Sequence, residues 1–131
     1  MLKQVLCLGL VLMSAQVHAA VWDVMEKRGN VTYYMERGSG SAAAELDGVV
    51  RSHFRTDFAK PQKLSNGKYY DRTTVWLTMD CEEQRFVGTN EVHYINGQEV
   101  HRVSGKNRTW INYDPKSTKT YHYLWRQTCL Q

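Results

Sequence analysis

Apolar and polar residues alternate with a period of two along the middle of the chain. Residues 48–58 place apolar and small side chains on one side and polar side chains on the other. The polar side carries Arg51, His53, Arg55 and Asp57. Residues 69–81 alternate in the same way, with Val75, Leu77, Met79 and Cys81 on one side. This period predicts two half-buried strands and puts Cys81 on the core side of the second.

Turn residues divide the rest of the chain into shorter segments. Asn96-Gly97 separates two runs with apolar residues, which favours a type I′ β-hairpin. Further strands are expected at 21–27, 31–35, 84–88 and 91–103. Loops or turns are expected at 37–44, 59–68 and 105–107.

The periodicity changes near the C-terminal end. Tyr121, Leu124, Trp125 and Thr128 recur at helical spacing. Asp114-Pro115 is typical of a helix start, with Asp as the N-cap and Pro in the first helical position. The pattern therefore predicts a helix over residues 115–129. Together these elements indicate an α+β fold: a single domain whose antiparallel β-sheet of about five or six strands carries a packed C-terminal α-helix.

The first nineteen residues predict a secretory signal peptide rather than part of the fold. Lys3 precedes an apolar run over residues 5–13, and small residues follow up to Ala19. The run is too short to span a bilayer, which takes about 20 apolar residues. Cys7 lies inside the run, so there is no lipobox and no evident lipoprotein. We expect cleavage after Ala19 and a domain at 20–131 that is periplasmic or secreted.

The composition sets further bounds. The chain has 131 residues, of which 42% are hydrophobic and 23% charged, with a formal net charge of +4. This favours one globular domain and excludes a multidomain enzyme or a polytopic membrane protein. The basic excess is too small to indicate a nucleic-acid-binding protein.

Two cysteines, Cys81 and Cys129, remain after removal of the signal peptide. An even number of cysteines in an exported domain favours a disulfide, and two cysteines allow one intramolecular pairing. Free thiols or an intermolecular bridge are the alternatives.

The histidines give no defined site. A two-residue hairpin loop would pair His93 with Val100, and His101 with Val92, which puts the two histidines on opposite faces. We therefore expect no metal site and no cofactor. His53, His93 and His101 could serve a ribonuclease, which uses histidines and a lysine around a phosphate, but no spacing fixes their geometry. We expect no enzyme and keep a ribonuclease-like hydrolase as a third hypothesis.

Basic residues suggest a surface for an acidic protein partner. The candidates are Arg51, Arg55, Lys106, Arg108, Lys116 and Lys119. Tyrosines such as Tyr113 and Tyr121 lie near the last of them. An ordinary charged surface is the alternative.

Several local patterns together resemble a known family. They are Trp22, Asp47-Gly48, Asp80-Cys81, Asn96-Gly97, the step from Trp110 to Pro115, and Cys129. Over most of residues 20–131 the chain resembles the surface-adhesin protein E family of small exported bacterial proteins. The resemblance implies an antiparallel sheet with a C-terminal helix and a cystine. It also implies binding to host extracellular-matrix proteins such as vitronectin or laminin, and dimers.

The leading hypothesis is thus an exported, non-enzymatic binding module of the adhesin E type. The alternative is a periplasmic inhibitor of a foreign enzyme such as lysozyme. Residues 65–69, Ser-Asn-Gly-Lys-Tyr, resemble the Ser/Gly-Lys-Tyr loop of one such inhibitor family.

Overall fold

The computed structural model describes residues 19–40, 48–104 and 109–130. Four expectations fall wholly or partly outside these ranges: the signal peptide, the latter part of the 37–44 loop, the turn at 105–107, and the candidates Lys106 and Arg108.

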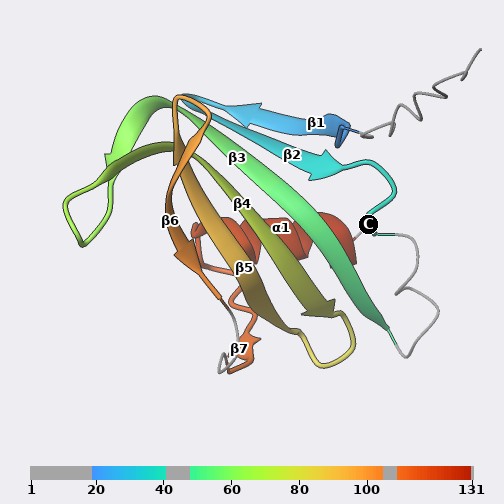
Figure 1. Ribbon diagram of the computed structural model, residues 1–131. Helices are drawn as coiled ribbons and strands as arrows, with labels where there is room; N and C mark the ends of the chain where they lie inside the picture. Colours follow the sequence, from blue (N-terminus) through green and yellow to red (C-terminus); the bar gives the residue numbers. More distant parts are fainter. Residues whose placement is uncertain (1–18, 41–47, 105–108, 131) are drawn as a thin grey trace, which may run out of the picture.

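The described chain forms one seven-stranded antiparallel sheet and one helix (Figure 1). The strands β1 to β6 follow one another across the sheet in chain order, and β7 pairs with β5. The elements are β1 Trp22–Arg28, β2 Val31–Glu36, β3 Val49–Lys63, β4 Tyr69–Asp80, β5 Arg85–Ile95, β6 Gln98–Val103, β7 Ile111–Asn112 and α1 Thr120–Cys129. The predicted α+β fold with an antiparallel sheet is confirmed.

Strand β3 is longer than its alternating pattern predicts. It pairs with β4 from Val49 to Asp57, shifts register, and pairs again at Gln62 and Lys63. The loop expected at 59–68 is therefore wrong for residues 59–63. Pro61 lies within the irregular stretch, where a missing N–H costs no regular ladder hydrogen bond.

The hairpin between β5 and β6 has the predicted turn. Asn96 and Gly97 have φ of 49° and 79°, as a type I′ turn requires. A register shift follows, because Tyr94 pairs with Glu99 whereas His93 pairs with His101. The expected opposite placement of the two histidines is therefore wrong: the extra residue in β6 brings their ring centroids to 5.6 Å on one face.

The helix begins later than predicted. Asp114 accepts a hydrogen bond from the Lys116 amide at 2.9 Å through its side chain and one from the Ser117 amide at 3.1 Å through its carbonyl, so Asp114-Pro115 forms a turn. Helix α1 begins at Thr120 after Lys119, which is extended and provides no side-chain cap. Its end at Cys129 is as expected. No helix among the described residues has the length and hydropathy to cross a membrane.

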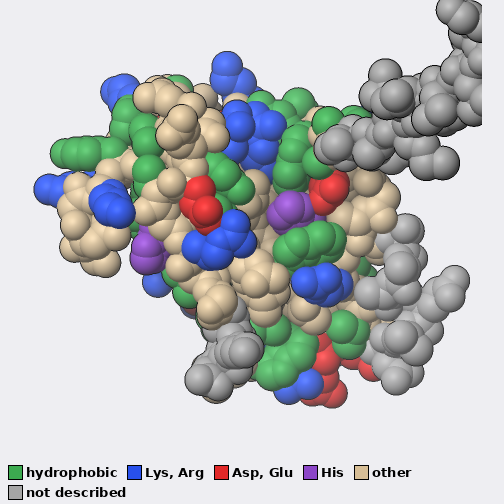
Figure 2. Space-filling model, viewed as in Figure 1, with side chains coloured by type: hydrophobic (Ala, Val, Ile, Leu, Met, Phe, Trp, Pro, Cys, Tyr) green, Lys and Arg blue, Asp and Glu red, His purple; other side chains and the backbone are tan. Residues whose placement is uncertain are grey.

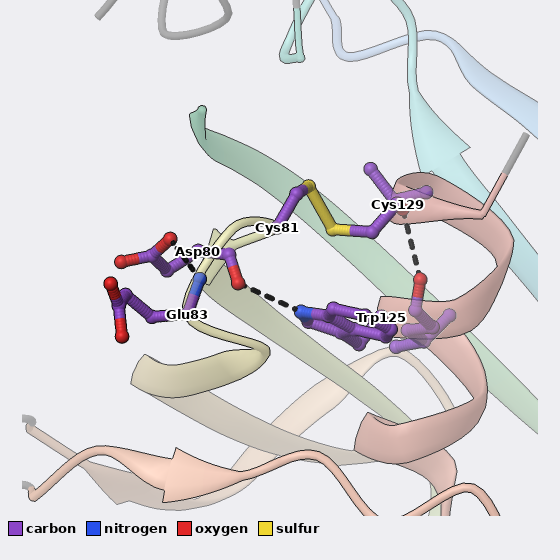
Figure 3. Close-up of a disulfide and its surroundings, with 7 residues drawn as sticks. Asp80, Cys81, Glu83, Trp125 and Cys129 are labelled. Atoms are coloured by element: carbon purple, nitrogen blue, oxygen red, sulfur yellow. Dashed lines mark hydrogen bonds between the residues drawn. A yellow bond between two sulfur atoms is a disulfide. The ribbon is translucent and has the colours of Figure 1, made fainter. Parts of the chain in front are cut away.

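The core lies between α1 and one face of the sheet. Phe54, Leu77, Met79 and Trp125 are fully buried there. The indole of Trp125 donates a hydrogen bond to the Asp80 carbonyl at 3.3 Å, which ties the helix to the end of β4 (Figure 3).

The predicted disulfide joins the same two elements. Cys81 follows β4 and Cys129 ends α1, and their Cα atoms lie 5.3 Å apart (Figure 3). Beside it, the Asp80 carboxylate accepts a hydrogen bond from the Glu83 amide at 3.0 Å. The C-terminal end of the helix is thus fixed to the sheet both covalently and by packing.

Candidate binding face

The sheet has a second face that α1 does not cover, which we call the open face. In Figure 1, β1 to β6 lie in front of α1, so the open face is turned toward the viewer. On β3 it carries the side chains that alternate with buried Ser52, Phe54 and Thr56. These open-face residues are Arg51, His53, Arg55 and Asp57. Their β4 partners are Thr78, Trp76, Thr74 and Arg72.

Aromatic rings form a continuous column across the open face. The rings of His53 and Trp76 stack with centroids 4.5 Å apart and an interplanar angle of 3°. Trp22 from β1 approaches His53 at 4.9 Å, and the Arg51 guanidinium lies 4.2 Å from the Trp76 ring centre. We call Trp22, His53, Trp76 and Arg51 the ring column. It joins an edge strand to the middle of the sheet.

A carboxylate fixes the histidine of this column. The Nδ1 atom of His53 lies 2.6 Å from Oε2 of Glu36 on β2. Because its ring is held from three sides, its orientation is set before any partner arrives. Figure 2 looks onto the open face and shows a histidine with hydrophobic side chains on two sides and acidic and basic side chains nearby.

An ion-pair network lies beside the column. Asp57 accepts hydrogen bonds from Nε of Arg55 at 2.8 Å and Nε of Arg72 at 2.9 Å. Burial acts to raise the pKa of Asp57, but the hydrogen bonds from the two arginines outweigh it and hold that pKa below its ordinary value. Arg55 also lies over the Tyr34 ring at 4.5 Å. One carboxylate thus serves two guanidinium groups, which leaves this network with net positive charge.

A hollow of about 340 Å³ lies in the open face next to the ring column. Its lining comes from four strands and consists of His53, Thr74, Trp76, Asn90, Val92, Tyr94 and Arg102. The pairing of β4 with β5 is irregular here, because Trp76 faces Thr89 whereas Thr74 faces Val92. The extra residue makes a bulge, and Asn90 within it has a φ of 51°.

Cations outnumber carboxylates on the open face. The strand register and side-chain contacts place Lys27, Arg51, Arg55, Arg72, Arg85 and Arg102 there, against Glu36, Asp57, Asp80 and Glu99. Arg51 forms no ion pair with a described carboxylate and is exposed. The face therefore favours a partner with negative charge.

The predicted basic surface is divided by the fold. Arg51 and Arg55 lie together on the open face. Lys116 and Lys119 are exposed in the segment that leads into α1, on the other side of the sheet. The structure brings the first two together and does not bring the last two to them.

Several residues of the open face were not predicted from the sequence. Trp76 has a usable signal, since the alternation that turns Val75 and Leu77 inward also turns Trp76 outward. Trp22 and Asn90 have no such signal for their place on the open face. Their positions depend on how β1 pairs with β2 and on the bulge where β5 pairs with β4.

The three histidines proposed for ribonuclease chemistry do not come together at one site. His53 lies on the open face, whereas His93 and His101 lie on the other face beside Tyr70. Burial lowers the pKa of His93. Within the described ranges, no three His, Cys, Asp or Glu side chains are arranged to hold a metal ion.

Two comparisons with known proteins found similarities. A family model described as surface-adhesin protein E matches residues 22–129. No curated protein matches. Among solved structures, the crystal structure of protein E from non-typeable Haemophilus influenzae is similar, with a TM-score of 0.48 and 15% sequence identity. That comparison covers 84% of this chain and 82% of that chain.

Proposed function

Because the chain belongs to the surface-adhesin protein E family, we propose that it is an exported, non-enzymatic protein that binds a protein partner through its open face. One observation carries the proposal: the protein's own helix covers one face of the sheet and leaves a column of aromatic and basic side chains uncovered on the other. Aromatic residues and arginines are the side chains that most often supply binding energy at protein interfaces.

Export is supported by two features of the chain. Residues 1–19 have the layout of a secretory signal peptide. The Cys81–Cys129 bridge suits an oxidising compartment. The exported domain is periplasmic or secreted in this proposal, and the family suggests host extracellular-matrix proteins as partners.

The basic excess of the open face determines which part of a partner it contacts. Arg51 is exposed and carries a charge that no described carboxylate neutralises. We expect it and Arg55 to meet acidic segments of the partner, so that binding weakens as salt screens the charges.

Immobilised vitronectin and laminin test the proposal in a surface plasmon resonance experiment. The double variant Arg51→Gln/Arg55→Gln should bind about tenfold more weakly at low salt, because two interfacial cations are lost. The matched control, Lys116→Gln/Lys119→Gln, removes the same charge from the other side of the sheet and should bind like the parent protein. No binding to either matrix protein at low salt, or equal losses in both variants, contradicts the proposal.

A second candidate is inhibition of a foreign enzyme such as lysozyme, and the tip of the β3–β4 hairpin favours it. Ser65, Asn66, Gly67 and Lys68 are exposed there, and the turn is closed by the Leu64 amide donating to the Lys68 carbonyl at 2.8 Å. A bacteriolysis assay with lysozyme distinguishes the two functions. Protection by the parent protein that is lost in Lys68→Ala would favour inhibition, and absence of protection would remove it.

A further inference from the structure

The proposed function assigns no role to the hollow beside the ring column. It is polar along most of its wall, and it lies where a β-bulge interrupts the pairing of β4 and β5. Asn90, the bulge residue, takes a backbone conformation that non-glycine residues adopt infrequently. Such bulges often redirect a side chain beside a functional site.

Several hydrogen-bonding groups on its wall have no hydrogen-bond partner among the described residues. No described group hydrogen-bonds to the side chains of Asn90, Tyr94 or Thr74. Several polar groups that converge on one concave surface without internal partners are typical of a ligand site.

The remaining polar groups on the wall are already oriented. Arg102 donates from Nε to Glu99 at 2.5 Å, and its terminal nitrogens have no hydrogen-bond partner within the described ranges. His53 is held by Glu36 and by the two tryptophan rings. At Arg102 and His53 a ligand would therefore meet side chains whose conformations cost little further entropy to fix.

The available groups favour a carboxylate. The Asn90 amide, the Tyr94 hydroxyl and the Arg102 guanidinium can all donate hydrogen bonds, and a carboxylate accepts several at once. At one end the Arg51 guanidinium on the Trp76 ring carries a charge that no described carboxylate neutralises, and at the other Arg102, which is paired with Glu99, contributes hydrogen-bond donors.

We infer that this hollow is a subsite for an aspartate or glutamate side chain of an extended segment of the partner protein. The inference rests on the proposed function, because it assigns one anchor point within the same open face. The segment would lie across the strands, with its acidic side chain on Asn90, Tyr94 and Arg102 and its neighbouring residues against the ring column.

Two conservative variants test the site without disturbing the fold. Asn90→Gly removes the amide and keeps a residue that adopts positive φ readily. Tyr94→Phe removes only the hydroxyl. Thr32→Val is the matched control, because Thr32 pairs with Asp57 on the same face and does not line the hollow.

The probe is a short end-blocked peptide with two glutamates between glycines, and its twin carries glutamine in their place. Binding to the exported domain is followed by NMR through the indole N–H of Trp76, assigned with Trp76→Phe. The glutamate peptide should shift that signal, with affinity reduced about tenfold in Asn90→Gly and in Tyr94→Phe and unchanged in Thr32→Val. Equal binding of the glutamine peptide, or equal affinity in all variants, overturns the assignment.

Binding of the same variants to immobilised vitronectin and laminin separates the two proposals. If matrix binding depends on Arg51 and Arg55 but not on Asn90 and Tyr94, the subsite is overturned and the proposed function stands. If the glutamate peptide binds at Asn90 and Tyr94 but no matrix protein binds, the subsite is supported and matrix adhesion is overturned.

Discussion

The two faces of this sheet are built from alternate residues of the same strands, yet they differ in what covers them and in the kinds of contact they make. Beneath α1, Phe54, Leu77 and Met79 have no measurable exposure. Their immediate neighbours His53 and Trp76 are half-buried and make ring and charge contacts on the open face. Successive residues of one strand therefore contribute alternately to the core and to the candidate binding face.

The difference indicates where sequence can change without loss of the fold. Apolar contacts under the helix contribute most of the free energy of folding, because they remove large surfaces from water. The contacts of the open face are partly solvated and individually weaker. That face can be specialised for binding at little cost in stability.

The largest expected effect is at the centre of the covered face. Trp125→Ala removes a fully buried side chain and its hydrogen bond to the Asp80 carbonyl. It should lower the free energy of unfolding by about 3–5 kcal/mol, measured by urea denaturation. Trp76→Ala on the open face is the comparison and should cost less than half as much. Equal losses would show that the ring column also supports the fold.

Removal of the disulfide should have the next largest effect. Cys81 and Cys129 are 48 positions apart, so the cross-link restricts the unfolded chain considerably. Cys81→Ser/Cys129→Ser should lower the free energy of unfolding by about 2–4 kcal/mol. If the faces are independent, the folded double mutant keeps the parent affinity for an acidic ligand, and a parallel loss of affinity would contradict that independence.

A smaller effect is expected from the ion-pair network on the open face. Asp57→Asn breaks its pairs with Arg55 and Arg72 and should cost about 1 kcal/mol at neutral pH. The pKa of Asp57 is held below its ordinary value of 3.8, so its contribution exists above that pH and is lost as the pH falls through the lowered pKa. Denaturation curves between pH 6 and pH 2 should therefore converge for the parent and the variant.

The smallest effect is expected at His93, which lies on β5 on the same side of the sheet as α1. Burial lowers the pKa of His93, so its protonation favours the unfolded chain. The neighbouring Glu91 opposes that shift and His101 adds to it. Stability should fall as the pH drops below the ordinary histidine value of 6.5. His93→Phe should reduce this slope between pH 7.5 and pH 5, and an unchanged slope would assign it to other groups.

The sequence was sufficient for the strands whose pattern is local. Alternation around Phe54 and Leu77 fixed both the strands and their inward faces, and Asn96-Gly97 fixed the hairpin turn. Residues 59–63 were missed, because pairing with β4 continues β3 through a segment whose composition favours a loop.

The helix start was missed for a tertiary reason. Asp114-Pro115 has the composition of a helix N-terminus, but Tyr113 stacks on Trp125 at 4.0 Å and the Asp114 amide donates to Nδ1 of His122. These contacts fold the preceding segment back along α1. Composition alone does not contain them.

The candidate site could be predicted only in part. Arg51 and Arg55 were found from the polar side of one strand. Trp22 lies beside His53 through the register of β1 with β2, and the hollow lies where β5 carries a bulge at Asn90. Both depend on the register between strands, and the local pattern of a single sequence does not reveal that register.

The cystine also determines how the molecule responds to mechanical force. It closes residues 81–129 into a covalent ring that contains β5, β6, β7 and α1. Tension along the chain crosses the ring through the sulfur atoms, so about 160 Å of contour length stays unextended while the bridge is intact. Strands β1 to β4 lie outside the ring and are the part that stretching can unravel. While it holds a partner under flow, the protein would therefore extend to less than the contour length of its whole chain.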